Sequence, residues 1–223
     1  MAQRLLPAAL LLTLTYLLLL LLMAPLFDVR QVVVTGDTMH LNGQITALTG
    51  AQGQNIFTLR GASIAQRIAA LPDIKRVEVR PMLPDRLDVR VEEYTAKVVW
   101  HSGGRNYLVT DQGYVIKEGT QAGLLQLNDD RPLALAHGDH VDARVIQGVS
   151  RLQTLLLARG VPATRYVTMP EDTIAVEGPS GWRALFGLRG DMARGSDVLA
   201  QVLQRGLTFQ TLDLRPGASP FYR

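Results

Sequence analysis

The chain has 223 residues, a formal net charge of +3, 47 % hydrophobic residues and no cysteine. This charge is too small for a nucleic-acid-binding protein, which needs a strongly basic surface, so no nucleic-acid partner is expected. The lack of cysteine excludes disulfides and a thiolate nucleophile.

Residues 5–27 form an uncharged stretch that contains thirteen leucines. As a helix that rises ~1.5 Å per residue, it spans about 34 Å, enough to cross a hydrocarbon core of about 30 Å. A cleaved signal peptide is the competing interpretation, but such peptides have apolar cores of about 7–15 residues followed by a small-x-small cleavage site. Leu22 stands where a small residue would be needed. The stretch therefore predicts a retained transmembrane helix.

The charges that flank the stretch predict its orientation. Arg4 and the α-amino group precede it, and Asp28 follows it. Since cationic residues stay on the cytoplasmic side, residues 1–4 are expected to be cytoplasmic and the bulk of the chain extracytoplasmic. No second apolar stretch is long enough to span, so a single pass through the plasma membrane is predicted.

The segment after the stretch predicts a small α+β unit. Residues 29–35 are rich in valine and predict a strand closed by Gly36. Residues 44–48 suggest a short helix, and Ile64, Ile68 and Leu71 lie on one face of a second helix, which Pro72 ends. Residues 76–80 and 87–92 alternate between apolar and charged side chains, which predicts two half-buried strands joined by a turn at 81–85. Two short helices on one face of a small sheet follow from this order.

These residues carry a resemblance. The ordered series "VRQVVVTGD", "GQNIFTL" and "IAQRIAALPDIKRVEVRPMLPDRLDVRVEE", with Ala96 just beyond, resembles the POTRA module of the bacterial cell-division family FtsQ/DivIB. The resemblance implies a transmembrane helix at residues 5–27, a POTRA domain at 28–95 and a β-rich domain at 96–223.

The remaining residues resemble the second domain of that family, with two or more helices packed on an antiparallel sheet. Strands are expected at 98–100 and 107–116, with a tight turn at 111–113, and later at 166–168, 173–177, 182–186 and 209–215. Val145, Val149, Leu152 and Leu156 form the apolar face of a helix that Asp142 caps and Gly160 ends. A second helix is expected at 198–205, with Val198, Leu199, Val202 and Leu203 turned inward.

The densest group of potential metal ligands is His137, Asp139 and His140, with Asp129 and Asp130 nearby. Zinc or another divalent ion is one interpretation. No second ligand pair lies at metal-site spacing, however, and an ordinary polar loop is the stronger one. We therefore predict no metal and no cofactor.

Catalysis would need an oriented nucleophile, and the sequence has neither a G-x-S-x-G elbow nor an H-E-x-x-H motif. The acidic pairs at 92–93, 129–130 and 171–172 lie at predicted turns or strand ends. Adjacent strand residues face opposite ways, so these pairs are not expected to converge on a substrate. The prediction is a protein that is not an enzyme and has no small-molecule substrate. An exported or membrane-tethered hydrolase and a POTRA-containing envelope-assembly factor are the alternatives.

Four arginines project from the predicted hairpin of residues 76–92. On the functional interpretation they meet acidic partners, anionic lipid heads or wall polymers. On the structural one they form the polar side of a half-exposed sheet and pair across strands with Glu78 or Asp88. The arginines are Arg76, Arg80, Arg86 and Arg90.

The predicted function is the binding of partner strands at free sheet edges, where unpaired backbone groups accept an added strand. One candidate edge lies at residues 74–80 and the other at the carboxyl terminus. The resemblance implies partners like FtsB and FtsL, and also FtsW- or FtsI-like proteins, at the division septum. Arg215 is expected either to pair with a partner carboxylate or to close an internal ion pair, and aromatic side chains are expected to anchor the partner. The predicted partner-binding residues are Arg76, Val77, Glu78, Val79, Arg80, Arg215, Gly217, Ala218, Phe221 and Tyr222.

Overall fold

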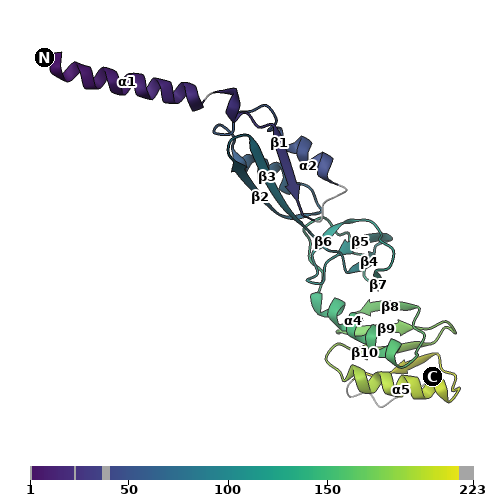
Figure 1. The fold of residues 1–223 in the computed structure, drawn as a ribbon. Helices are drawn as coiled ribbons and strands as arrows, with labels where there is room; N and C mark the ends of the chain where they lie inside the picture. Colours follow the sequence, from purple (N-terminus) through teal and green to yellow (C-terminus); the bar gives the residue numbers. More distant parts are fainter. Residues whose placement is uncertain (1, 23, 37–40, 216–223) are drawn as a thin grey trace. The chain divides into compact units, whose positions relative to one another are not determined.

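The structure, a computed structural model, describes residues 2–22, 24–36 and 41–215, except for the side chains of residues 2–10 and 21. The chain divides into two compact units, Met1–Tyr94 and Thr95–Arg223. Figure 1 shows the first unit in purple to blue and the second in teal to yellow. Each unit has its own hydrophobic core.

The first unit begins with helix α1 (Ala2–Leu22), followed by a short 3-10 helix, η1 (Pro25–Phe27). The leucine side chains at residues 11–20 of α1 are more than half exposed, among them Leu11, Leu14 and Leu17, whereas Leu22 at its end is partly buried. Among the residues that the structure describes, no helix reaches the length and mean hydropathy of a membrane span. The predicted anchor at residues 5–27 includes side chains outside the described ones.

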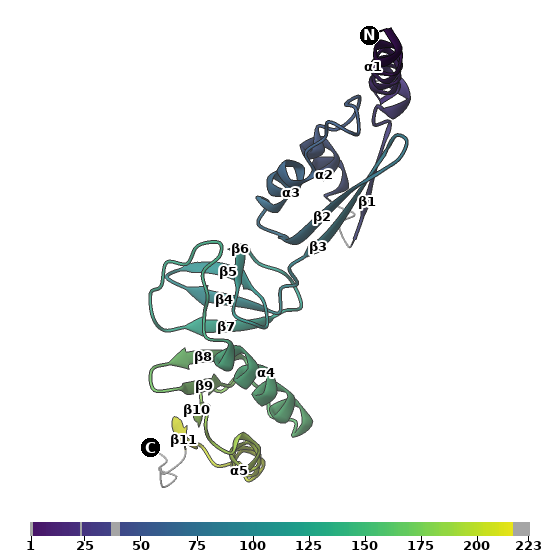
Figure 2. The ribbon, with the colours of Figure 1, turned by 90° about the vertical axis from the view of Figure 1, so that its left-hand side faces the viewer.

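The rest of the first unit follows the predicted order of strand, helix, helix, strand, strand. The elements are β1 (Gln31–Thr35), α2 (Asn42–Thr49), α3 (Gly61–Ala69), β2 (Ile74–Met82) and β3 (Arg86–Glu93). β3 is the central strand, parallel to β1 and antiparallel to β2. Figure 2 shows α2 and α3 together on one face of this sheet. Leu87, Val89 and Val91 of β3 pack against Ile45, Ile64 and Ile68 of the two helices in one core.

Two boundaries in this unit differ from the prediction. α3 ends at Ala69, so Leu71 reaches the core from the connection after the helix. β2 continues through Pro81 and Met82, where the sequence predicts a turn. A proline is tolerated there because β2 is an edge strand, in which a missing N–H need not break the ladder.

Gly36, directly after β1, is required by a close approach of two backbones. Its φ is +135°, and a Cβ atom at this position would lie 2.1 Å from the carbonyl oxygen of Val91. Only glycine fits such a contact in this conformation. The glycine that follows the first strand is thus explained by the packing of β1 against β3.

The described part of the second unit, residues 95–215, contains one sheet of eight strands and two helices. In sheet order the strands are β11-β10-β9-β8-β7-β4-β5-β6. Figure 2 shows α4 and α5 on the same face of this sheet. The elements are β4 (Val98–Ser102), β5 (Arg105–Val109), β6 (Val115–Glu118), β7 (Leu125–Asp129), α4 (Ala143–Ala158), β8 (Arg165–Met169), β9 (Thr173–Glu177), β10 (Arg183–Gly187), α5 (Met192–Gln204) and β11 (Thr211–Asp213).

The prediction of an antiparallel sheet in this unit is wrong, because the sheet is mixed. β7 is parallel to both β4 and β8, and β11 is parallel to β10. Parallel neighbours need a crossover connection, commonly a helix. α4 makes the crossover from β7 to β8, and α5 makes it from β10 to β11. The two helices predicted from apolar periodicity are therefore the crossovers of the parallel β7–β8 and β10–β11 pairs.

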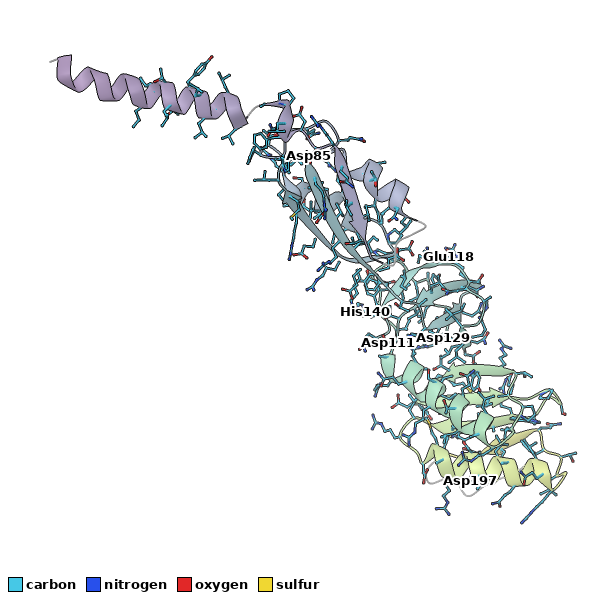
Figure 3. The ribbon with its side chains drawn as sticks, viewed as in Figure 1. Asp85, Asp111, Glu118, Asp129, His140 and Asp197 are labelled. Atoms are coloured by element: carbon cyan, nitrogen blue, oxygen red, sulfur yellow. The ribbon has the colours of Figure 1, made fainter. Side chains whose placement is uncertain are left out.

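Capping explains the ends of α4 as predicted. The Asp142 side chain accepts a hydrogen bond from the backbone N–H of Arg144 at 2.9 Å, and Gly160 has a φ of +66° just past the helix. α5 begins at Met192, six residues before the predicted start. α4 and α5 are joined by an ion pair in which Arg159 Nε lies 2.6 Å from Asp197 Oδ1; Figure 3 labels Asp197.

Candidate functional site

The free edge of β2 is the first candidate site. β2 ends the sheet order of the first unit, and no strand of the described chain pairs with its outer side. The β2–β3 register shifts between Ile74 and Arg76, which marks a β-bulge at Lys75. Bulges, lysines and prolines are features that protect edges from unspecific pairing. Lys75 and Pro81 thus bracket residues 76–80, the regular part of the free edge.

The two faces of this edge differ in chemistry. Val77 and Val79 are partly buried against the core beneath α2 and α3. Because side chains alternate along a strand, Arg76, Glu78 and Arg80 lie on the opposite face, away from the helices. An added strand would continue both a small apolar face and a charged one.

Glu78 and Asp88 pair with arginines of their own strands, not across strands as one interpretation of the sequence predicts, whereas Lys75 of β2 pairs with Glu92 of β3. In β2 the Arg80 guanidinium bonds Glu78, with Nη2 and Oε1 2.5 Å apart. In β3 the Arg86 guanidinium bonds Asp88, with Nε and Oδ1 2.6 Å apart, and this contact lowers the pKa of the Asp88 carboxyl. No hydrogen bond or ion pair joins the side chains of Arg76 or Arg90 to other described residues.

The second candidate site lies at β11, the last strand of the larger sheet in the described residues. β11 has three residues, fewer than the predicted 209–215, and it is held to β10 by bonds such as Leu214 N–H to the Leu185 carbonyl, 2.9 Å. Arg215 follows directly. Its Nη2 and Nε donate to the Asp213 carboxylate at 2.6 and 3.0 Å, and its Nη1 lies 3.9 Å from Glu171 Oε2.

The ion pair of Arg215 bears on its predicted role. The side chain is 37 % exposed and that of Asp213 is 18 % exposed. The hydrogen bonds from Arg215 lower the pKa of the Asp213 carboxyl. Arg215 therefore takes part in an internal ion pair, the second of the two predicted alternatives. The other predicted residues of this edge, Gly217, Ala218, Phe221 and Tyr222, lie outside the described residues.

The candidate metal ligands lie in a loop that is ordered by protein contacts. His137 Nδ1 lies 2.6 Å from the carbonyl oxygen of Ile116. The rings of His137 and His140 meet the ring of Tyr114 edge-on, with centroids 5.7 and 5.4 Å from its centroid. Asp139 accepts a hydrogen bond from the Ala136 backbone. In the part of the chain that is described, no three histidine or acidic side chains are grouped to hold a metal ion.

The acidic pairs are dispersed among local contacts. Asp129 is the last residue of β7, and its fully buried carboxylate bonds Arg131, with Nε and Oδ1 2.9 Å apart. Glu171 and Asp172 form a turn in the left-handed region, with φ values of +62° and +53°. Glu92 bonds Lys75, with Nζ and Oε1 2.5 Å apart.

The structure contains a polar hollow of about 220 Å³ that the sequence did not predict, because β7, which lines it, was not predicted as a strand. It lies on the helix-free face of the larger sheet, where His101 of β4 is opposite Asn128 of β7. Arg165 donates to Asn128 Oδ1 at 3.2 Å, and His101 Nδ1 lies 2.7 Å from Asn106 Oδ1. Figure 3 labels Asp129 at the end of β7, beside this hollow. The alternation of Leu125 and Leu127 with Gln126 and Asn128 was the available signal.

Comparison with known proteins gives consistent matches. Residues 27–94 match the profile of the POTRA domain, FtsQ-type. Over 201 residues the chain is 25 % identical to the cell division protein FtsQ of Chloroflexus aurantiacus, covering 88 % of this chain and 74 % of that protein. It is 31 % identical over 95 residues to the cell division protein DivIB of Clostridium acetobutylicum, covering 42 % and 38 % of the two chains. Over 131 residues it is 32 % identical to FtsQ of Syntrophotalea carbinolica, covering 58 % and 40 %.

The chain is therefore similar to the FtsQ and DivIB cell division proteins, and residues 27–94 match the POTRA module of that family. The POTRA match covers the whole three-stranded sheet, so the free edge at residues 76–80 lies within the family's own module. The match to the Chloroflexus relative extends over most of the chain, which includes much of the larger unit.

Proposed function

We propose that this protein is a membrane-anchored, non-enzymatic scaffold of bacterial cell division that binds partner proteins at its free strand edges. Similarity to the FtsQ and DivIB proteins is the observation that carries the proposal, since these relatives are named as cell division proteins. The FtsB- and FtsL-like proteins implied by the sequence resemblance are the proposed partners, with FtsW- or FtsI-like proteins as further ones.

Strand addition at β2 is the proposed binding mode in the first unit. A regular edge of five residues, 76–80, offers backbone N–H and C=O groups in the alternating pattern that a partner strand needs. The main chain supplies the affinity of such an interaction, and side chains on the two faces supply its selectivity. The unpaired guanidinium of Arg76 favours a partner strand that carries an acidic residue.

A second partner strand is proposed to bind at the carboxyl-terminal edge. β11 offers only three residues, so the predicted site depends on Gly217, Ala218, Phe221 and Tyr222 beyond it. To contribute to partner binding at this edge, the Arg215 guanidinium has to bind a carboxylate of the partner, either in place of Asp213 or in addition to it. Since Arg215 is 37 % exposed, a partner can reach its guanidinium without unfolding the strand.

Residues 5–27 are proposed to anchor the protein in the plasma membrane, with the amino terminus in the cytoplasm and the bulk of the chain outside. The leucines at residues 11–20 of α1 are exposed, and a helix that is apolar all round needs an apolar surrounding. The charge asymmetry between Arg4 and Asp28 supports the proposed orientation.

Depletion in the host bacterium tests the division role. Cells that lack the protein are expected to grow as filaments or unseparated chains, and the full chain is expected to restore septation. Normal septation after complete depletion would contradict the proposed role.

Two proline variants test the β2 edge. Of two successive residues in β2, one directs its N–H toward β3 and the other away from it. Val77→Pro and Glu78→Pro therefore form a matched pair, in which one variant breaks the sheet and the other removes only a free-edge donor. The variant that keeps the wild-type melting temperature is expected to lose capture of an FtsB- or FtsL-like partner. Wild-type capture by that variant would exclude the β2 edge as the binding site.

A charge reversal tests the carboxyl-terminal edge. Arg215→Glu is expected to weaken capture of the same partner, whereas Arg205→Glu, an exposed change at the end of α5, is expected to leave it unchanged. Equal capture by both variants would exclude Arg215 from the site.

A further inference from the structure

One end of the three-stranded sheet collects several chain segments. β1 begins at this end, β2 ends there and β3 begins there. Arg86 at the start of β3 is paired with Gln31 of β1 on one side and with Met82 of β2 on the other. The N–H of Arg30 donates to the carbonyl oxygen of Asp85 at 2.8 Å, which fixes the β2–β3 turn to the start of β1. Figure 2 shows this turn beside the start of β1, and Figure 3 labels Asp85 there.

The segment before α3 reaches the same end. The N–H of Ile56 donates to the Phe27 carbonyl at 2.8 Å, and Asn55 Nδ2 donates to the Leu22 carbonyl at 2.9 Å. The rings of Phe27 and Phe57 are in contact, with centroids 5.1 Å apart. These bonds join the loop before α3 to the last residue of α1 and to η1.

This end carries a cluster of exposed apolar side chains. Leu26 is 54 % exposed, Phe57 49 %, Met82 46 % and Leu83 64 %. They are all of the large apolar side chains that are exposed among the described residues between 24 and 94. We call these four residues the apolar patch. Scattered exposure of such residues is normal, but their confinement to one end of a small unit marks an interaction surface.

The exposed charged residues named beside the apolar patch are all positively charged. Arg30, Arg60 and Arg86 are exposed, with Arg86 paired to Asp88, whereas Asp28 and Asp85 are partly buried. Arginines can bury their aliphatic stems along an apolar surface and keep the guanidinium at the level of lipid head groups. Apolar side chains rimmed by arginine are typical of segments that lie in a membrane interface with anionic lipids.

We propose that the apolar patch inserts into the interface of the bilayer, at the boundary between head groups and acyl chains. This inference rests on the proposed membrane anchor. A lipid surface is the favoured occupant because Leu26 belongs both to the patch and to the apolar stretch of residues 5–27, so no linker separates the two. The consequence is that the small unit is held against the membrane by a second contact besides the anchor.

Site-directed fluorescence in vesicles tests the inference, and the absence of cysteine makes the wild-type chain a suitable background. Leu83→Cys in the full chain is labelled with an environment-sensitive dye. The chain is then reconstituted without other proteins in vesicles of phosphatidylethanolamine and phosphatidylglycerol. Ala70→Cys is the matched control, because Ala70 is exposed and precedes the start of β2, at the other end of the sheet.

The label at residue 83 is expected to emit at shorter wavelength and to be quenched by nitroxides on the lipid acyl chains, whereas the label at residue 70 keeps the emission of an aqueous site. If the chain floats with the vesicles but residue 83 reports water, the membrane contact of the patch is overturned while the anchor stands. A protein partner would then be the better occupant. If the chain does not float with the vesicles, the anchor fails and the inference fails with it.

A second variant shows whether the patch acts as a surface. In the chain labelled at residue 83, Phe57→Asp is expected to reduce quenching by the acyl-chain nitroxides, because an aspartate disfavours insertion of the neighbouring loop. Leu207→Asp is the control, since Leu207 is 56 % exposed but belongs to the other unit. Equal quenching in the Phe57→Asp and Leu207→Asp chains would overturn the role of Phe57 and with it the four-residue patch.

Discussion

Pairing of an arginine with an acidic residue two positions away recurs throughout the molecule. Two of the five pairs lie on strands, where residues at i and i+2 share a face and can form a local hydrogen-bonded pair. The other three lie at the end of a strand or the start of a helix. Exposed pairs of this kind contribute little to stability but neutralise charges that would otherwise be available to partners. The pairs are Glu78–Arg80, Arg86–Asp88, Asp129–Arg131, Asp142–Arg144 and Asp213–Arg215.

The Asp213–Arg215 pair predicts a pH effect. The folded-state pKa of Asp213 is lowered, so the pair stabilises the fold above the unfolded-state pKa and this contribution is lost as pH falls through the lowered pKa. Arg215→Gln is expected to raise the pKa of Asp213 toward its ordinary value and to cost about 0.2–1 kcal/mol near neutral pH. NMR titration of the Asp213 carboxyl measures the shift. An unchanged pKa of Asp213 would contradict the ion pair.

Gly36 predicts a larger effect. Gly36→Ala places a Cβ against the Val91 carbonyl and forces a strained φ, so it is expected to destabilise the first unit by about 1–3 kcal/mol or more. Gly43→Ala is the matched control, because Gly43 lies in α2 with no heavy atom near its added Cβ. That change is expected to stabilise by about 0.5–1 kcal/mol. Chemical denaturation of both variants measures the difference, and equal stabilities would refute the close approach.

At the scale of elements, the N-terminal cap of α4 is testable. Asp142→Ala removes the acceptor for the Arg144 N–H and is expected to cost about 0.5–2 kcal/mol. The hydrogen bonds from Arg144 lower the pKa of Asp142, so the charged cap stabilises above the unfolded-state pKa and less as pH falls through the lowered value. Urea unfolding measures the difference in unfolding free energy between the wild type and Asp142→Ala. This difference is expected to become smaller below about pH 4. A difference that grows on acidification would contradict the charged cap.

Periodicity predicted most of these elements but not their neighbours in the sheet. Ile64 and Ile68 of α3, or Val145 and Val149 of α4, mark one buried face of a helix, which local spacing reveals. Which strand lies beside β7 depends instead on pairings with residues far away in the sequence. The mixed order of the larger sheet therefore could not be derived from alternation alone.

The missed features have local physical causes. β7 has only Leu125 and Leu127 as apolar residues and ends at a buried aspartate, so it looks like a polar connection. The first turns of α5 contain Gly195, where an added Cβ would lie 2.9 Å from the Phe186 ring. Close packing thus selects a residue of poor helix propensity. Strand β2 was predictable from its own alternation, whereas its place at the edge of the sheet and the Asp213 partner of Arg215 depend on contacts with other residues.

At the scale of the whole molecule, the two hydrophobic cores share no residue. Residues 29–91 supply one core, and residues 98–212 supply the other. A fold built in this way divides the proposed functions between two units with separate cores, one with the β2 edge and the apolar patch and one with the β11 edge.

This division predicts that mutational effects in the two units are independent. Gly36→Ala is expected to shift only the unfolding of the first unit, and Asp142→Ala only that of the second. In the double variant the two changes in unfolding free energy are expected to add within about 0.3–0.5 kcal/mol, because sites without shared partners do not couple. Hydrogen exchange of the full chain follows the amides of Val89 and Val149 as reporters of the two cores. A change at Val149 caused by Gly36→Ala would show that the cores unfold as one, and the separate-unit interpretation would have to be abandoned.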